Sequence, residues 1–214
     1  MKREFDMSLY LVTDSDLAAG RDLEWIVSEA VAGGVTMVQI RDKDSSTRDF
    51  IDVARRVKEA LRAAGSGVAV VANDRVDVAL AADLDGVHIG QSDMSYEDAR
   101  RLLGPDKIVG LSVENMSQVE LANGLDVDYI GISPIYATPT KEDTAEPFGL
   151  EGCAMAVELS RHRAVAIGGM NRGTIGAVMA QGVEGVAVVS AIVAADDPRS
   201  AAQDLMRIIK DEEL

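Results

Sequence analysis

An amide and two cations stand at alternate positions where one β-branched run of the sequence ends. The three residues are Gln39, Arg41 and Lys43. Alternate side chains of an extended strand point to the same face, so these three would lie on one side. Donors of this kind suit a polyanion such as pyrophosphate. The alternative is a solvated basic loop in which Arg41 and Lys43 pair with Asp42 and Asp44.

Two carboxylates follow the next two β-branched runs. Asp74 comes directly after Asn73 at the end of one run, and Asp93 follows the end of the next. Mg²⁺ is commonly held by a few carboxylates together with phosphate oxygens of a substrate, which indicates a metal and pyrophosphate site. The alternative is that both carboxylates are N-caps of the helices that follow. His88, inside the run at residues 86–89, is expected to be a hydrogen-bonded core group rather than a metal ligand.

Hydroxyl groups and a lysine follow the fifth and sixth runs. Ser112 ends the fifth run, where it either donates to a phosphate or only terminates the strand. The sixth run leads into a long loop, residues 136–147, which carries Thr138, Thr140 and Lys141. Prolines stiffen this loop, so its hydroxyls and ammonium would form a preorganised set of donors. A plain polar lid is the alternative.

The ends of the last two runs form a second candidate anion site. The seventh run ends at Gly168-Gly169, where backbone N–H groups could approach an anion closely. A short helix predicted from Ser190 would aim its N-terminal N–H groups the same way. Cys153 lies in a predicted helix with no acid–base partner near it in the sequence, and it is expected to be structural.

Eight β-branched runs alternate with helical patterns, and these elements must position the residues above. The predicted strands span residues 8–13, 36–41, 68–73, 86–89, 107–112, 129–134, 164–168 and 185–189. The predicted helices span residues 23–32, 46–64, 95–103, 117–122, 150–159, 171–181 and 198–210. A capping box is expected at Ser95, and Pro198 suits the first turn of the last helix.

This alternation predicts a single (β/α)8 TIM barrel, an α/β fold that spans residues 1–214 as one catalytic domain. The carboxyl ends of all eight strands then meet at one face. Active sites lie on that face, and a phosphate site after strands seven and eight is a recurring feature. An open doubly wound sheet is the alternative. That fold has a Gly-rich phosphate loop after its first strand, where this chain has Thr13-Asp14-Ser15.

Composition limits the classes of function. The chain has 214 residues, of which 47% are hydrophobic, and a formal net charge of −15. The apolar content excludes a disordered chain, and the acidity makes nucleic acid or an anionic membrane a poor partner. One cysteine excludes a disulfide framework and a cysteine-based zinc site, which suits a cytoplasmic location. Neither a membrane span nor a targeting segment is expected, because no apolar run is long enough.

Seven segments in this order resemble the thiamine-phosphate synthase family, also called thiamine-phosphate pyrophosphorylase. They are residues 9–14, 39–43, 73–74, 86–93, 133–141, 167–169 and 189–192. The resemblance implies a transferase that couples hydroxymethylpyrimidine pyrophosphate to thiazole phosphate, forms thiamine phosphate and releases pyrophosphate. It also implies Mg²⁺ as cofactor, small molecules as partners and a homodimer.

The resemblance assigns roles by motif position. Residues implied to hold the pyrimidine pyrophosphate are Gln39, Arg41, Lys43, Asn73, Ser112 and Lys141. The four implied to contribute to catalysis are Arg41, Lys43, Ser112 and Lys141. Asp74 and Asp93 are implied Mg²⁺ ligands. Residues implied to hold the thiazole phosphate are Thr138, Thr140, Gly169, Val189 and Ser190.

Two positions depart from the family pattern. The segment Val113-Glu114-Asn115 stands where the family often has a His-containing segment, and Ser133 stands where it commonly has Gly.

Two other functions stay open at this point. One is a tautomerase-like barrel that acts on thiazole phosphate and needs neither the carboxylate pair nor Lys141. The other is a non-catalytic barrel that binds phosphate ligands.

Overall fold

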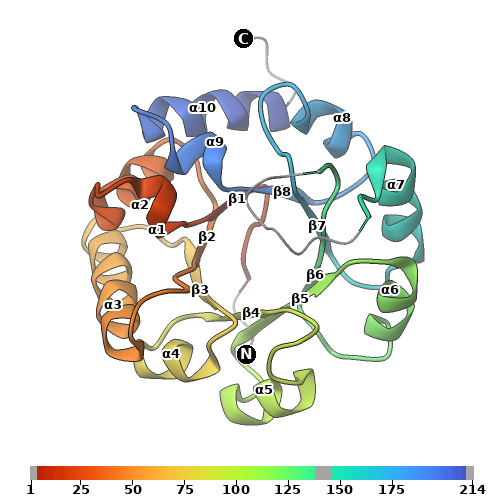
Figure 1. Cartoon of the computed structure of the whole chain (residues 1–214), viewed down its shortest axis with the longest axis horizontal. Helices are drawn as coiled ribbons and strands as arrows, with labels where there is room; N and C mark the ends of the chain where they lie inside the picture. Colours follow the sequence, from red (N-terminus) through yellow and green to blue (C-terminus); the bar gives the residue numbers. More distant parts are fainter. Residues whose placement is uncertain (1–3, 138–145, 211–214) are drawn as a thin grey trace.

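Eight parallel strands form a closed barrel (Figure 1). The computed structural model describes residues 4–137 and 146–210. Each strand pairs with the next along the chain, and β8 pairs with β1. The strands are β1 (Leu9–Val12), β2 (Met37–Ile40), β3 (Ala69–Asn73), β4 (Gly86–Ile89), β5 (Ile108–Val113), β6 (Tyr129–Ile132), β7 (Ala164–Ile167) and β8 (Gly185–Val188). The predicted TIM barrel is confirmed and the open sheet is excluded.

Helices surround the barrel as an outer ring (Figure 1). They are α1 (Ser15–Ala18), α2 (Leu23–Ala32), α3 (Thr47–Ala63), α4 (Val76–Ala81), α5 (Tyr96–Leu103), α6 (Met116–Ala122), α7 (Gly149–Leu159), α8 (Ile175–Met179), α9 (Ser190–Val193) and α10 (Pro198–Ile209). Within the described ranges, no helix combines the length and apolar character needed to cross a bilayer.

The sequence pattern does not predict α1 and α4, and it makes α8 too long. α1 has four residues and α4 has six, too few to show a helical period. α8 begins late because side chains close a turn before it. The Asn171 N–H donates to the Thr174 hydroxyl at 2.9 Å, and the Gly173 N–H donates to the Asn171 side chain at 2.8 Å. Ser95 is the N-cap of α5 and accepts the Asp98 N–H, but its hydroxyl, rather than its backbone N–H, donates to the Asp98 carboxylate, so the reciprocal half of the predicted capping box is not formed. Pro198 lies in the first turn of α10, as predicted.

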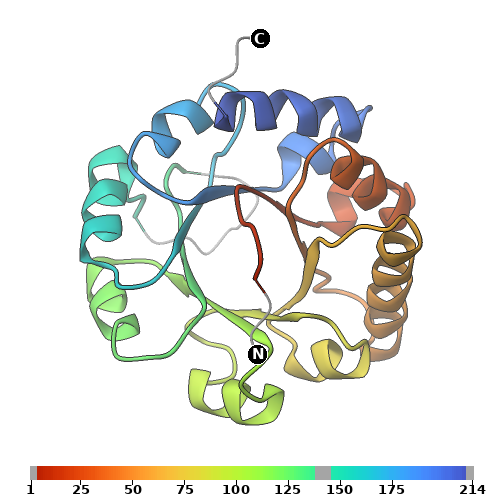
Figure 2. The same cartoon turned by 180° about the vertical axis from the view of Figure 1, so that it is seen from behind.

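Alternation along the strands divides the core into two layers. Leu9 and Leu11 of β1 pack outward among the helices, whereas Tyr10 belongs to the cluster inside the barrel. Residues 4–8 run across the amino-terminal opening of the barrel (Figure 2). There the ring of Phe5 packs edge-on against Tyr129, with 6.0 Å between ring centroids. The interior is therefore a packed core rather than a pore.

At the amino-terminal ends of the strands, polar side chains complete backbone hydrogen bonding. The acceptors share one position, immediately before a strand, and each takes the N–H of the preceding strand. The pairs are Thr36 with Leu9 at 3.1 Å, Asp85 with Val70 at 2.9 Å and Asp128 with Val109 at 2.8 Å. Each side chain satisfies a backbone donor at the start of a strand, where the ladder itself offers no partner.

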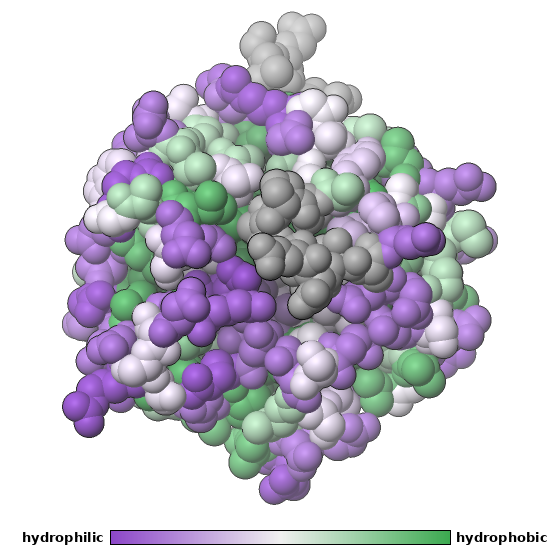
Figure 3. Space-filling model, viewed as in Figure 1, coloured by the Kyte–Doolittle hydropathy of each residue, from purple (hydrophilic) through white to green (hydrophobic). Residues whose placement is uncertain are grey.

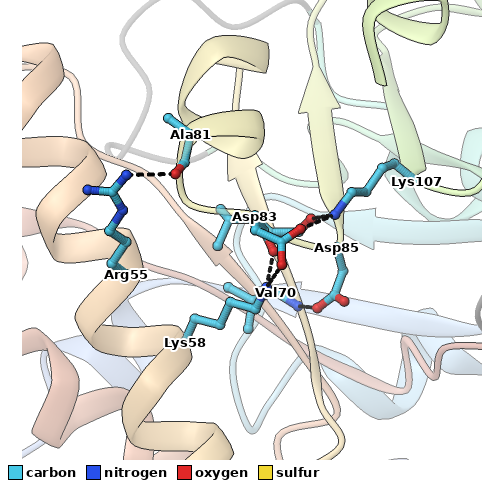
Figure 4. Close-up of polar contacts among 8 residues, drawn as sticks. Arg55, Lys58, Val70, Ala81, Asp83, Asp85 and Lys107 are labelled. Atoms are coloured by element: carbon cyan, nitrogen blue, oxygen red, sulfur yellow. Dashed lines mark hydrogen bonds and ion pairs between the residues drawn. The ribbon is translucent and has the colours of Figure 1, made fainter. Parts of the chain in front are cut away.

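A cluster of ion pairs surrounds Asp83 at the same end (Figure 4). Lys58 of α3 and Lys107, just before β5, reach its carboxylate at 3.0 and 2.8 Å. Lys107 also donates to the Leu84 carbonyl at 2.6 Å. These two lysines hold the pKa of Asp83 down at about 2. The cluster links a helix, a loop and a strand at the end of the barrel away from the predicted site residues.

Candidate active site

A cavity of about 1110 Å³ lies at the carboxyl-terminal end of the barrel. Every described residue with a predicted site role lines it: Gln39, Arg41, Lys43, Asn73, Asp74, Asp93, Ser112, Gly169, Val189 and Ser190. Thr138, Thr140 and Lys141 lie outside the described residues. The face seen in Figure 1 is largely hydrophilic toward its middle (Figure 3). The topology thus brings together residues that are up to 151 positions apart (39 to 190).

Arg41 is held over the cavity by Asp14, a residue without a predicted role. The Arg41 guanidinium donates to the Asp14 carboxylate at 2.7 Å, and both side chains are largely buried. Asp14 also caps α1 by accepting the Leu17 N–H at 3.0 Å. The alternative pairing of Arg41 with the acids of its own loop is wrong. Instead, Asp42 accepts the Ser45 N–H at 3.0 Å and shapes the turn.

Asp74 and Asp93 are not helix caps. The N-cap of α5 is Ser95, and α4 begins without any side-chain cap. Asp93 accepts the Gly90 N–H at 2.8 Å, and Asp74 accepts the Asn73 side-chain amide at 2.7 Å. Asp74 also has a φ of 60°, a left-handed conformation that costs energy in a non-glycine residue. The capping alternative is wrong for both carboxylates.

The two carboxyl groups lie against each other. Burial, followed by the hydrogen bond to and the charge of the neighbouring Asp93 carboxyl, raises the pKa of Asp74 to about 6. The Asn73 amide and the Lys43 charge oppose this rise. Two carboxylates in contact repel when both are charged, so they favour a shared proton or a cation between them. This arrangement can therefore hold a divalent metal ion.

Below the carboxylates, five polar side chains inside the barrel form a continuous hydrogen-bonded chain. In order along it they are Gln39, Tyr10, Tyr129, His88 and Ser112. The four successive distances are 2.7, 2.8, 2.9 and 2.8 Å. His88 is buried and uses both ring nitrogens, so its expected role as a hydrogen-bonded core group is confirmed. Neither tyrosine has a role predicted from the sequence. Only its inward position on its strand could have indicated one.

At the predicted phosphate site after β7 and β8, two successive glycines leave the backbone uncovered by side chains. Gly168 and Gly169 have φ values of 101° and 72°, which favour glycine. A Cβ atom at Gly169 would lie 2.8 Å from the Tyr136 Cβ. A side chain there would therefore strain the backbone and displace Tyr136, so such a variant is no clean probe of an anion. Ser190 begins α9, a helix of four residues.

Cys153 has no place in this cavity. Its thiol is buried in α7, and burial raises its pKa to about 11. A thiol with a raised pKa is a poor nucleophile at neutral pH, which confirms the structural reading.

Acidic side chains outnumber cations around the cavity. Its described lining contains five carboxylate residues, Asp14, Asp16, Asp74, Asp93 and Glu114, and two cationic ones, Arg41 and Lys43. In the departing segment, Asn115 caps α6 by accepting the Gln118 N–H at 3.0 Å, and the Glu114 N–H donates to the Gln118 side chain at 2.6 Å. An anionic ligand would need additional positive charge to enter this lining.

Comparison of the sequence with known proteins gives a consistent result. The family model described as thiamine monophosphate synthase matches residues 9–192. A thiamine-phosphate synthase of Vibrio campbellii is 50% identical over 204 residues, covering 94% of this chain and 98% of that protein. The protein of the same name from Vibrio parahaemolyticus is 51% identical over 203 residues, covering 94% and 97%.

Comparison of the fold agrees. A solved structure of thiamine phosphate pyrophosphorylase from Pyrococcus furiosus superimposes with a TM-score of 0.86 at 35% identity, covering 96% of each chain. A 3-hexulose-6-phosphate synthase superimposes with a TM-score of 0.66 at 19% identity, covering 94% of this chain and 99% of that one. The second likeness concerns the barrel alone. The first extends to the sequence.

Proposed function

The chain belongs to the thiamine monophosphate synthase family and is a transferase of thiamine phosphate synthesis, and from that premise we propose how its cavity divides between two substrates. The reaction couples hydroxymethylpyrimidine pyrophosphate to thiazole phosphate and releases pyrophosphate. The pyrophosphate lies at the ends of β2 to β5, and the thiazole phosphate lies at the ends of β7 and β8. The chemistry of the lining supports this division.

The pyrophosphate side has the donors that a leaving group of this charge requires. Arg41, oriented by Asp14, and Lys43 face it, together with the Asn73 amide and the Ser112 hydroxyl. Lys141, assigned by motif position, would complete this set. The thiazole phosphate side takes the backbone of Gly169 and Val189 and the hydroxyl of Ser190, with Thr138 and Thr140. These assignments rest on motif position and on the shared lining of the cavity.

Asp74 and Asp93 are the proposed ligands of Mg²⁺. Two crowded carboxylates and a cavity lining rich in acids fit a divalent cation, because Mg²⁺ prefers hard oxygen ligands and keeps waters. The described residues contain no group of three His, Cys, Asp or Glu side chains suited to a metal, so the remaining ligands would come from the pyrophosphate and water. Bound there, Mg²⁺ would neutralise negative charge on the leaving group.

The reaction then needs charge stabilisation and positioning more than an acid–base pair. The bond from the pyrimidine methylene carbon to the pyrophosphate oxygen breaks, and the aminopyrimidine stabilises the resulting cation. The thiazole nitrogen then donates its electron pair to that carbon. Arg41, Lys43 and Ser112 bind the departing pyrophosphate as its charge grows. The two separate anion subsites hold the partners in line.

The observation that carries this proposal is the carboxylate pair of Asp74 and Asp93 at the mouth, beside Arg41 and Lys43. The test is an assay of pyrophosphate release from the two substrates, with and without Mg²⁺. We expect release that requires both substrates and the metal. A tautomerase-like barrel would interconvert thiazole phosphate without releasing pyrophosphate, and a non-catalytic barrel would bind without turnover.

The proposed enzyme is one barrel domain of the cytoplasm that works as a homodimer on small molecules. Exposed apolar residues on the packed helices α6 and α7 support association, since Leu121 and Met155 are 70% and 54% exposed. Sedimentation equilibrium would decide the oligomeric state, and a monomer at micromolar concentration would contradict it.

A further inference from the structure

The hydrogen-bonded chain inside the barrel has a direction. Its far end is the side-chain amide of Gln39, whose N–H donates to the Tyr10 hydroxyl at 2.7 Å. An amide nitrogen can only donate, so the oxygen of Tyr10 accepts there. The proton of Tyr10 is then free for its other partner, the Tyr129 hydroxyl at 2.8 Å.

The same reasoning passes along the next two links. The Tyr129 hydroxyl accepts from Tyr10, so its own proton goes to Nδ1 of His88 at 2.9 Å. An imidazole that accepts at Nδ1 carries its proton on Nε2 in the neutral form. Nε2 therefore donates to the Ser112 Oγ at 2.8 Å. Burial raises the pKa of both tyrosines well above the ordinary value, which keeps both protons in place.

We propose that this chain fixes His88 as the Nε2–H tautomer and thereby turns the Ser112 hydroxyl into a dedicated donor toward the pyrophosphate. Ser112 accepts from His88 on one side, so its proton is available to the cavity it lines. Pyrophosphate oxygens can only accept, and they would be repelled by an oxygen lone pair. Tyr10, Tyr129 and His88 are then positioning residues, and the proposal rests on the proposed function for the identity of the anion.

The barrel has room for this chain because two of its inward positions are glycine. A Cβ atom at Gly110 would lie 2.2 Å from the Tyr129 ring, so that position must lack a side chain. A Cβ atom at Gly131 would lie 3.1 Å from the His88 ring. Both glycines face the chain from neighbouring strands. Packing thus holds the two rings in one orientation and leaves their polar atoms in line.

The alternative protonation states leave the chain unsatisfied. If His88 carried its proton on Nδ1, it would donate to Tyr129, which already accepts from Tyr10. The proton of Tyr129 would then lack an acceptor, since its hydroxyl has only these two partners among the described residues. An imidazolium would create the same conflict. A buried donor without an acceptor is costly, which favours the single direction.

The first experiment reads the tautomer directly, by nitrogen-15 NMR of the substrate-free enzyme at the pH of the assay. The chain has two histidines, so the spectrum is simple. His162 is an internal reference, because its Nε2 faces the Ala122 carbonyl at 2.8 Å and must be protonated to bond it. We expect His88 to give the same Nε2–H pattern. An Nδ1–H pattern, or a doubly protonated ring, would overturn the proposal.

The second experiment tests whether Tyr129 acts through Ser112, by measuring kcat for pyrophosphate release. Tyr129→Phe should lower kcat roughly three- to tenfold, the equivalent of one neutral hydrogen bond. In a Ser112→Ala background the same change should have no further effect, because no hydroxyl remains to be directed. An equal loss in both backgrounds would show that Tyr129 acts independently and would overturn the proposal.

A matched control removes a tyrosine hydroxyl elsewhere. Tyr96 donates to the Asp126 carbonyl from the outer helix α5, away from the cavity, and Tyr96→Phe should leave kcat unchanged. The NMR experiment can fail independently of the proposed function. If the wild-type enzyme released no pyrophosphate, the proposed reaction would fall, while the NMR spectrum would still decide the direction of the chain.

Discussion

Asp74 and Asp93 at the carboxyl-terminal end of the barrel face each other, whereas Asp85 and Asp128 at the amino-terminal end face backbone N–H groups. At the amino-terminal end, the carboxylates accept from Val70 and Val109 at 2.9 and 2.8 Å. At the other end, crowding contributes to a raised pKa of Asp74. Aspartates thus stabilise the fold at one end of the barrel, whereas at the other end two aspartates repel each other when both are charged.

We propose that the difference separates carboxylates that stabilise the fold from carboxylates that take part in the chemistry. A carboxylate that is already satisfied gains little from a ligand, whereas a crowded pair gains a great deal from a cation. TIM barrels place active sites at the carboxyl-terminal face and rely on the other face for stability. Substitutions at the carboxyl-terminal end should therefore change activity, and substitutions at the amino-terminal end should change the unfolding free energy.

The largest effect is expected at the crowded pair. Asp74→Ala or Asp93→Ala should lower kcat roughly 10³-fold, because the proposed metal site loses half of its protein ligands. The melting temperature should stay the same or rise slightly, since either change relieves repulsion. Activity assays and calorimetry on each variant measure the two quantities. Asp44→Ala, which removes an exposed carboxylate from the loop after β2, is the control.

A large loss of stability in these variants, with an unchanged Mg²⁺ response of the folded fraction, would contradict the comparison. Both carboxylates would then belong with the structural set at the amino-terminal end.

The opposite pattern is expected for Asp128. Its carboxylate pairs with Arg100 at 2.7 Å, and the two side chains are only 9% and 16% exposed. Asp128→Ala leaves this cation and the Val109 N–H without their partner, which should lower the unfolding free energy by about 2–4 kcal/mol. The kcat of the folded enzyme should not change. Urea denaturation measures the first quantity and a low-temperature assay the second.

Asp52→Ala is the matched control for Asp128. Asp52 pairs with Arg55 on the surface of α3 at 3.8 Å, with more than half of each side chain exposed. An exposed pair contributes less than about 1 kcal/mol. If both variants lost the same stability, burial of the Asp128 pair would not be the reason for its effect.

Lys141 should behave as a residue of the cavity even though it lies outside the described residues. In the proposed reaction the leaving group gains charge as its bond breaks, so a cation there stabilises the transition state more than the ground state. Lys141→Ala should lower kcat on the order of 10²-fold. Binding of the pyrimidine pyrophosphate alone, measured by calorimetry, should change much less.

Lys141→Arg should restore activity only in part, because a planar guanidinium does not superimpose on an ammonium. An alanine variant with unchanged kcat would reduce Lys141 to a solvated residue of its loop.

Sequence patterns predicted the fold well because the barrel repeats one local signal. Each strand is buried and contains β-branched residues, and the observed strand ends differ from the predicted ends by at most two residues, as in β6 (Tyr129–Ile132). The short helices α1 and α4 were not predicted, because they span only four and six residues, and only α1 has a side-chain cap. The convergence of the site residues followed from the topology once the barrel was assumed.

Partners across the barrel could not be predicted. Nothing near Arg41 in the sequence shows that it pairs with Asp14, 27 positions earlier and just after the neighbouring strand β1. Tyr10 and Tyr129 meet across 119 positions, and each looks like an ordinary core aromatic. Their hydroxyls acquire a role only because inward positions of different strands meet. Such contacts depend on register, which a single sequence does not fix.

The smallest effect is expected at Asp83, and it depends on pH. Lys107 and Lys58 hold its pKa down at about 2, below the value in the unfolded chain, so its ionised form stabilises the fold. This contribution is fully present above the unfolded pKa of about 4, and it disappears as the pH falls toward 2. Because the side chain is 82% exposed, screening keeps the contribution below about 1 kcal/mol. Asp83→Asn should therefore lower stability slightly at pH 7 and make a much smaller difference at pH 2, measured by urea denaturation at both values. Added salt should shrink the difference at pH 7, since exposed pairs are screened. A difference of the same size at pH 2 as at pH 7 would show that Asp83 stabilises the loop through its backbone conformation, with a φ of 49°, rather than through its charge.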